Sequence, residues 1–240
     1  MDSPAVLQID VVSDVVCPWC YVGKRQLERA IALQQEDYPG LTPPALRWRP
    51  FQLNPTLPLQ GMPRAAYLRQ KFGSADGGAR YDRVRAAARE VGLDLALDRI
   101  TIQPNTLKAH GLIELALESG RQTLLVEAFF KAYFADGRDL SQDTTLRDIA
   151  TAVGLDSDLI EIVLDTEAIS RLVAAADADL IEYGVTGVPL FIIGRGDGRA
   201  DARRVAVSGA QGPQALLQAM RQVQQDYEPG PSADWKPARR

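Results

Sequence analysis

The stretch Leu-Gln-Ile-Asp-Val-Val-Ser-Asp-Val-Val-Cys-Pro-Trp-Cys, residues 7–20, decides the fold of this chain. Residues 7–13 are rich in β-branched side chains and partly alternate between apolar and polar, which predicts a strand entering a core. Over residues 18–35 the apolar side chains recur mostly at intervals of three or four, which predicts a helix. A C-x-x-C pair, Cys17 and Cys20, therefore lies where a strand ends and a helix begins.

The elements that follow describe an α/β domain interrupted by helices. Residues 46–53 alternate and predict a second strand, which completes a β-α-β unit. The next hundred or so residues have almost no strand signal, and their periodicity predicts helices at 64–72, 79–91, 106–118, 122–135, 144–153, 157–164 and 168–182. Strand patterns return at 188–193 and 204–208, around a Gly/Asp-rich turn, and a last helix is expected at 213–225.

Each flanking half is too small to bury a sheet alone, so the two halves are expected to form one discontinuous domain. We place this domain at 1–60 and 183–227, with a helical insertion domain at 61–182 between its β-α-β and β-β-α halves. The tail at 228–240 has the composition of a flexible terminus.

Composition and charge restrict the classes of partner. The chain has 240 residues, 46% apolar and 24% charged, which is ordinary globular usage. Its formal net charge is -4 and it has no run of Lys or Arg, which argues against nucleic acid and anionic membranes as partners. The start lacks the features of a secretory signal, and no apolar run approaches the roughly 18 residues of a membrane helix. We therefore expect a cytoplasmic protein.

The C-x-x-C pair points to thiol chemistry. The free amides and the dipole of a helix N-terminus favour negative charge on Cys17, which is expected to lower its pKa and make it the nucleophile. Cys20, one turn further along the helix, is expected to be more buried and to resolve a mixed disulfide. Pro18 and Trp19 lie between them and are expected to influence the redox potential through amide donors and solvent access.

Two other interpretations of the pair are weaker. A structural zinc ion needs four ligands, and the chain offers two Cys and one His, so no metal site is predicted. Two inert buried cysteines are the other alternative, since Cys packs as a small hydrophobe. A structural disulfide does not suit a reducing compartment, which leaves redox chemistry as the better explanation.

Four segments resemble a known family. They are Cys-Pro-Trp-Cys-Tyr-Val-Gly-Lys at 17–24, Trp-Arg-Pro-Phe-Gln-Leu-Asn-Pro at 48–55, Pro-Asn-Thr-Leu-Lys-Ala-His at 104–110 and Gly-Val-Thr-Gly-Val-Pro at 184–189. The chain resembles the DsbA-like thioredoxin family over about residues 7–225. Within the family it is most similar to the FrnE-type dithiol-disulfide oxidoreductases, which are related to 2-hydroxychromene-2-carboxylate isomerases and kappa-class glutathione transferases.

The resemblance implies a thioredoxin fold with a helical insertion, Cys17 as nucleophile, and Pro189 as a cis-proline facing the active-site disulfide. Val188 would then offer its main chain to an extended peptide or to glutathione by β-strand addition. The plainer interpretation of Val188 is a strand residue of the core.

Three further residues are candidate ligand contacts, each with a structural alternative. His110 has a titration range that suits proton transfer, but it lies among apolar residues, where a lone His is more often part of the packing. Asn54 and Asn105 lie in the family-like segments, but Asn beside Pro is also typical of loops. A further set of side chains either lines a groove between the insertion and the sheet or belongs to the core: Trp48, Phe51, Tyr67, Phe72 and Met62.

The function predicted first is a thiol-disulfide oxidoreductase or isomerase, with protein, peptide or glutathione thiols and disulfides as substrates. No metal or organic cofactor is required, and glutathione is the candidate co-substrate. The alternatives are a glutathione-dependent isomerase or transferase, in which related enzymes commonly have serine in place of Cys17, and a binding or holdase module. Monomer and homodimer are both compatible with the sequence.

Overall fold

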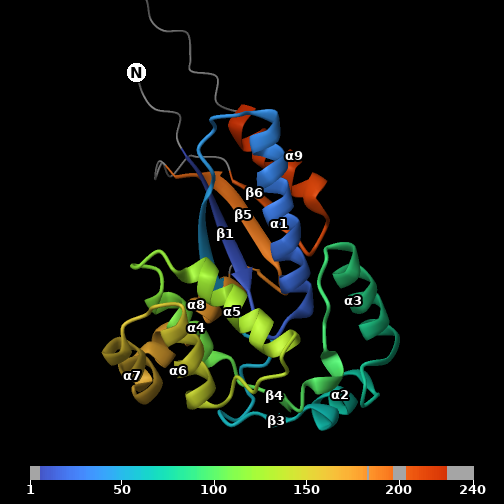
Figure 1. Cartoon of the computed structure of the whole chain (residues 1–240), viewed down its shortest axis with the longest axis vertical. Helices are drawn as coiled ribbons and strands as arrows, with labels where there is room; N and C mark the ends of the chain where they lie inside the picture. The colour runs from blue at the N-terminus through green and yellow to red at the C-terminus, as the bar shows by residue number, and fades with distance from the viewer. Residues whose placement is uncertain (1–5, 183, 197–203, 226–240) are drawn as a thin grey trace, which may run out of the picture.

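The computed structural model describes residues 6–182, 184–196 and 204–225. The predicted tail at 228–240 and residues 197–201 of the predicted turn lie outside the described residues. The described chain forms a mixed α/β structure in which a small sheet lies above a group of helices (Figure 1). This is the predicted α/β class, a thioredoxin-like fold with a helical insertion.

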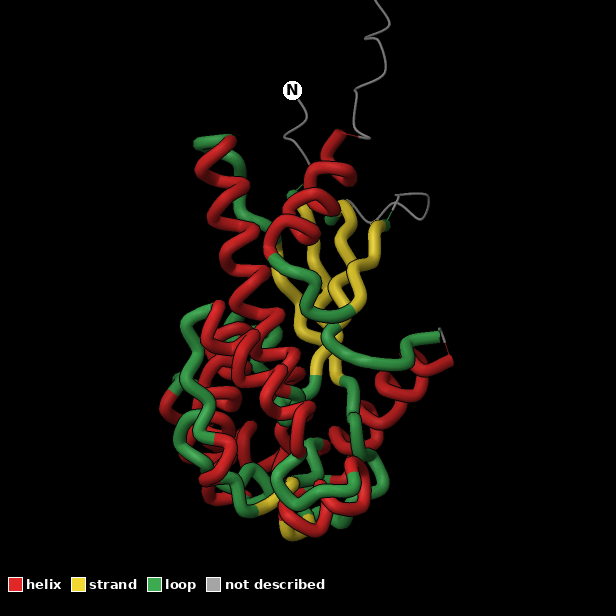
Figure 2. Tube along the Cα trace, turned by 90° about the vertical axis from the view of Figure 1, so that its right-hand side faces the viewer, coloured by secondary structure: helices red, strands yellow, loops and turns green. Residues whose placement is uncertain are grey.

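The main sheet has four strands in the order β2-β1-β5-β6. The strands of the sheet are yellow in Figure 2. β1 (Leu7–Ser13) pairs in parallel with β2 (Ala45–Pro50) and antiparallel with β5 (Leu190–Arg195), which pairs antiparallel with β6 (Val205–Ser208). β1 lies inside the sheet and is buried along almost its whole length. β1 is therefore the strand entering the core that the pattern of residues 7–13 predicts.

Two helices cover one face of this sheet. α1 (Pro18–Asp37) begins directly after β1 and α9 (Pro213–Gln225) lies beside it. Gly23 allows α1 to come close to β5: a Cβ atom there would lie 3.0 Å from Cγ of Pro189 and 3.1 Å from the ring of Phe191. The missing side chain therefore sets how closely the first turns of α1 approach the start of β5.

The insertion places helices below the sheet, at the end where α1 begins (Figure 1). α2 (Arg64–Phe72) and α3 (Gly78–Glu90) form one group on the right. The other group consists of α4 (Leu107–Leu115), α5 (Gln122–Phe134), α6 (Asp143–Ala152), α7 (Ser157–Asp165) and α8 (Glu167–Glu182). All seven helices that the periodicity predicts are present.

The differences from the predicted elements are local. α4 ends at Leu115 rather than 118, because the chain tightens into turns that close at Gly120, whose φ is 67°. β5 begins at Leu190 rather than 188, after a proline that has no N–H for the ladder. A two-stranded sheet of β3 (Met62–Pro63) and β4 (Ile102–Gln103), together with a 3-10 turn η1 (Leu97–Arg99), is too short to leave a pattern in the sequence.

Side chains of the insertion close the free edge of β2. Trp48 N–H donates to Oε1 of Gln122 at 2.9 Å, and Nε2 of Gln122 donates back to the Trp48 carbonyl at 3.4 Å. Two residues after β2, Gln52 N–H donates to Oδ1 of Asp177 on α8 at 3.1 Å. An edge strand otherwise exposes main-chain groups that can pair with another chain. The insertion is therefore joined to the sheet as well as packed against it.

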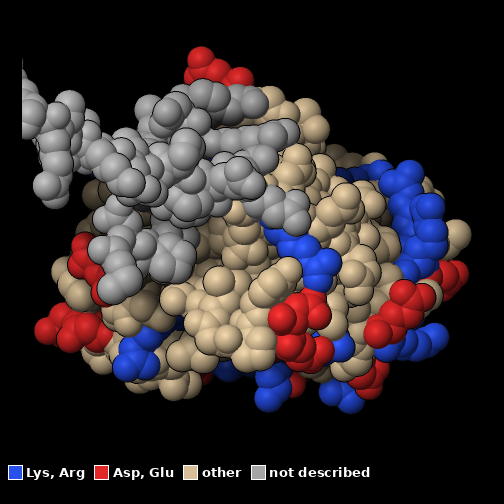
Figure 3. Space-filling view, turned by 90° about the horizontal axis from the view of Figure 1, so that it is seen from above, with Lys and Arg blue, Asp and Glu red and all other residues tan. Residues whose placement is uncertain are grey.

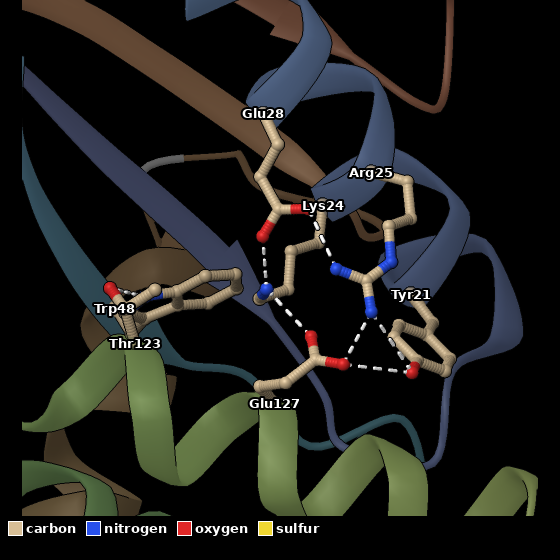
Figure 4. Close-up of polar contacts among 7 residues, drawn as sticks. All are labelled: Tyr21, Lys24, Arg25, Glu28, Trp48, Thr123 and Glu127. Atoms are coloured by element: carbon tan, nitrogen blue, oxygen red, sulfur yellow. Dashed lines mark hydrogen bonds and ion pairs between the residues drawn. The ribbon is translucent and has the colours of Figure 1, made fainter. Parts of the chain in front are cut away.

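A polar cluster joins α1 to α5 (Figure 4). Nζ of Lys24, whose side chain is only 4% exposed, lies 2.7 Å from Oε2 of Glu127 and also pairs with Glu28. Arg25 pairs with both of these carboxylates, and Tyr21 donates to Oε1 of Glu127 at 3.0 Å. Burial opposes ionisation of Glu127, but Lys24, Arg25 and Tyr21 outweigh it, so the pKa of Glu127 is lowered.

The surface seen from above has acidic and basic side chains interspersed (Figure 3). Of the helices in the described ranges, none is both long and apolar enough to cross a membrane.

Candidate active site

Cys17 is the N-cap residue of α1, in an extended conformation. Its N–H donates to the carbonyl of Asp14 at 3.0 Å, and its own carbonyl accepts from Cys20 N–H at 3.0 Å. Pro18 is the first residue of the helix, where a missing N–H leaves no bond unmade. No acidic side chain lies in the first turn. The Cys17 sulfur therefore lies at the helix end whose dipole favours negative charge.

The peptide bond between Val188 and Pro189 is cis, as the family resemblance implies. It faces the start of α1, and Sγ of Cys17 lies 3.7 Å from the carbonyl oxygen of Val188, within reach of a weak S–H donor. Residues separated by 171 positions thus meet at one point. The structure brings Cys17, Pro18, Trp19 and Val188 together along one pocket, with Pro189 directly behind.

Cys20 lies deeper than Cys17. The exposed fraction is 2% for Cys20 and 5% for Cys17, and only Cys17 lines the pocket. Both are free thiols. Burial, followed by the neighbouring Cys17 thiol and its charge, raises the pKa of Cys20 well above its ordinary value, while the nearby Ser13 side chain and Asp14 backbone act in the opposite direction. Cys20 is therefore held as a thiol behind Cys17.

A buried acid supports this arrangement. Asp14 is fully buried; its Oδ2 accepts from Leu53 N–H at 2.8 Å and its Oδ1 accepts from Val16 N–H at 3.4 Å. Nε2 of His110 lies 3.5 Å from Oδ1 of Asp14. Asp14 is not among the site residues that the sequence predicts, although an aspartate lies only three positions before the first cysteine. Asp14 fixes the loop between β1 and α1 against the chain that leaves β2.

A pocket of about 530 Å³ opens beside Cys17. One wall is the start of α1 and the Gly187–Val188 segment; the other is formed by α2 and α3. Its volume falls in the range of small-molecule sites. The lining includes aromatic side chains (Trp19, Tyr67, Phe72 and Tyr81) and basic ones (Arg64, Lys71, Arg80 and Arg83). None of the described lining residues is Asp or Glu.

The three candidate ligand contacts occupy different places. Asn54 lines the pocket; its Oδ1 accepts from Tyr67 at 3.0 Å and from Lys71 at 2.9 Å, while its Nδ2 is buried without a partner. Asn105 lies outside the pocket and is bonded to Gln52, the Leu57 carbonyl and Leu107 N–H. His110 also lies outside, beside Asp14, and its Nε2 has no hydrogen-bond partner.

The side chains predicted either to line a groove or to belong to the core are divided between the two places. Of the groove candidates, Tyr67 and Phe72 line the pocket, whereas Trp48 and Phe51 are core residues. Across the described part of the chain, no group of three or more His, Cys, Asp and Glu side chains is placed to hold a metal ion.

Comparison with known proteins agrees with this geometry. The model of the DSBA-like thioredoxin domain matches residues 8–221. A crystal structure described as a probable DsbA oxidoreductase from Streptomyces coelicolor is 32% identical, with a TM-score of 0.77 over 93% of this chain and 92% of that one. The chain belongs to the DsbA-like thioredoxin family.

Two more distant structures share the fold. The cytosolic disulfide reductase DsbM from Pseudomonas aeruginosa, solved with GSH, is 15% identical with a TM-score of 0.59, over 91% of this chain and 96% of that one. A 2-hydroxychromene-2-carboxylate isomerase is 17% identical with a TM-score of 0.59, over 91% and 97%. The fold thus occurs in proteins of both chemistries named by the resemblance, and the FrnE-type branch remains a prediction.

Proposed function

We propose that this protein is a thiol-disulfide oxidoreductase in which Cys17 is the nucleophile and Cys20 resolves. The observation that supports it most is the division of the two thiols: Cys17 opens into the pocket at the N-terminus of α1, while Cys20 is enclosed behind it with a raised pKa. A nucleophilic thiol that faces the pocket and a resolving thiol enclosed behind it are what a two-step exchange requires.

In the reducing direction, the Cys17 thiolate attacks one sulfur of a substrate disulfide. The substrate S–S bond breaks, a Cys17–substrate disulfide forms, and the other half leaves as a thiolate. Cys20 then loses its proton and attacks Sγ of Cys17, which releases the second substrate thiolate and leaves a Cys17–Cys20 disulfide. Two electrons pass to the substrate, and a small thiol such as glutathione would reduce the enzyme again. The oxidising direction is the reverse.

The Val188 main chain would hold the substrate against the cysteines. Its carbonyl lies beside Sγ of Cys17, so an extended thiol or disulfide that pairs with this segment presents its sulfur to the nucleophile. Pro189 and Trp19 shape this approach, and neither adds a titratable group. No step needs a metal or an organic cofactor.

Insulin reduction tests the proposal, with dithiothreitol as the electron source. Wild type is expected to accelerate precipitation of the insulin B chain, and Cys17→Ser to return it to the uncatalysed rate. Cys20→Ser is expected to accumulate mixed disulfides at Cys17. Turnover by Cys17→Ser at the rate of wild type would refute the mechanism.

A second candidate function is a glutathione-dependent isomerase or transferase. The basic pocket beside Cys17 favours it, because glutathione is anionic. Cys20 separates the two functions: a transferase needs only one group at the position of Cys17, so Cys20→Ser would leave its turnover intact. A holdase would retain its binding in Cys17→Ala, whereas the oxidoreductase would lose turnover in that variant.

A further inference from the structure

Arg64, the first residue of α2, is a buried cation that has no anionic partner among the described residues. It is 6% exposed, and it lines the pocket that also contains Cys17. NH1 donates to Tyr133 at 3.0 Å and to Gln103, NH2 donates to Tyr81, and Nε is buried without any partner. These partners are phenol and amide oxygens. Within the described ranges, no carboxylate pairs with this guanidinium.

The tyrosines around Arg64 do not supply the missing charge. Burial raises the pKa of Tyr81, although Arg64 acts to lower it. Burial likewise raises the pKa of Tyr133. Both phenols are therefore neutral at physiological pH. An unpaired buried charge is costly, and the first turn of a helix is a position where the dipole disfavours a cation. An anionic ligand would relieve both costs.

The other charged side chains that line the pocket are also positive. Lys71, Arg80 and Arg83 line it with no acidic residue among the described lining. Lys71 lies over the ring of Tyr67 at 5.2 Å and Arg80 over the ring of Phe72 at 4.9 Å, so aromatic faces hold these two side chains. Asn54 adds an unpartnered buried Nδ2 donor. Nε of Arg64 and Nδ2 of Asn54, which both lack a partner, are both hydrogen-bond donors.

We propose that Arg64 binds a carboxylate in this pocket, and that the substrates of Cys17 are low-molecular-weight disulfides or thiols bearing a carboxylate. Arg64 is then the residue that determines specificity, and Lys71 and Arg80 attract the anion toward it. The choice of substrate rests on the proposed function, but the anion site does not. A pocket of about 530 Å³ fits a small molecule, which favours a free thiol compound over a folded protein.

Alkylation of Cys17 by two matched reagents tests the anion site without redox turnover. Iodoacetate and iodoacetamide transfer equivalent carbon atoms and release iodide, but only iodoacetate is charged. The full chain with Cys20→Ala has one reactive thiol, Cys17. The measured quantity is the rate constant for iodoacetate divided by that for iodoacetamide. This ratio does not depend on the thiolate fraction of Cys17, because both reagents react with the same thiolate. We expect this ratio to be at least about tenfold higher in the folded chain than in the same chain unfolded in urea, and to fall by about tenfold in Arg64→Gln, the scale of a charge-assisted hydrogen bond.

Matched variants separate the anion site from a structural role. Arg69→Gln changes an exposed arginine of α2 that does not line the pocket, and should leave the ratio unchanged. Arg64→Lys should recover part of the ratio. If Arg64→Gln fails to fold, the double change Lys71→Gln with Arg80→Gln, both exposed, should lower the ratio severalfold and weaken its dependence on salt. A ratio equal to that of the unfolded chain, or unchanged in a folded Arg64→Gln, would overturn the proposal.

Disulfide turnover then tests the substrate class. Arg64→Gln should slow reduction of 3,3′-dithiodipropionate about tenfold, while reduction of its neutral diamide and of insulin stays within twofold. A loss on insulin with no change on dithiodipropionate would overturn the assignment to small substrates. A normal alkylation preference without turnover of any disulfide would refute the oxidoreductase and leave the anion site standing.

Discussion

Gly23 on α1 lies directly against Pro189, the residue before β5: a Cβ atom on the glycine would be 3.0 Å from the proline Cγ. This contact joins the helix that begins with the C-x-x-C pair to the cis peptide that faces it. Both sides of the proposed site therefore depend on one glycine inside a helix, where glycine is otherwise unfavourable.

Gly23→Ala tests this contact. Alanine in a helix normally adds about 1 kcal/mol of stability, but here it must displace Pro189 or Phe191. We expect a net loss of about 1–3 kcal/mol in the free energy of unfolding, measured in urea, as is typical of overpacked sites. Gly187→Ala is the control, because a Cβ there meets nothing within 4 Å. A Gly23→Ala variant more stable than wild type would show that the close approach is not required.

Glu127→Gln tests the connection between α1 and α5. Lys24 is almost fully buried, and the change removes its charged partner at 2.7 Å while Glu28 remains. We expect a loss of about 1–3 kcal/mol in unfolding free energy, because a buried charge loses much of its compensation. Glu28→Gln removes a carboxylate that is 42% exposed and should cost clearly less. Equal effects of the two changes would mean that the cluster adds little to the docking of the insertion.

Alkaline pH tests the environment of Tyr21. Burial, then the charge and hydrogen bond of Glu127, raise the pKa of Tyr21 to about 12 from its ordinary value of 10. The folded state holds this proton more tightly, so the stability it contributes is complete below pH 10 and is lost as the pH rises toward 12. The stability difference between wild type and Tyr21→Phe, from urea unfolding at several pH values, should therefore shrink over this interval. A constant difference would contradict the raised pKa.

The sequence predicts the helices and strands of the molecule well, because these elements depend on local patterns of apolar and polar residues. Periodicity locates the helices of the insertion, and the alternation at 7–13 locates a buried strand, β1. The cis form of Pro189 was implied by family resemblance and could not be derived from the residue itself.

The pocket could be predicted only in part, because it depends on distant pairings. In the sequence, Arg64 is indistinguishable from an exposed charged residue at the start of a helix. Its burial depends on Tyr81, Tyr133 and Gln103, which only the fold brings around it. Asn105 has the opposite outcome, since its loop position is compatible with a ligand contact, yet the fold uses its side chain for three hydrogen bonds.

Equilibration of the purified protein with glutathione redox buffers tests directly whether Cys17 and Cys20 form a redox-active pair. Thiol trapping of each sample, followed by mass spectrometry, counts the free thiols of Cys17 and Cys20. We expect one reversible two-electron transition in which both thiols disappear together as an intramolecular disulfide, and no such transition in Cys17→Ser or Cys20→Ser. Persistence of both free thiols, or only a glutathione adduct on Cys17, across the whole range of buffers would contradict it.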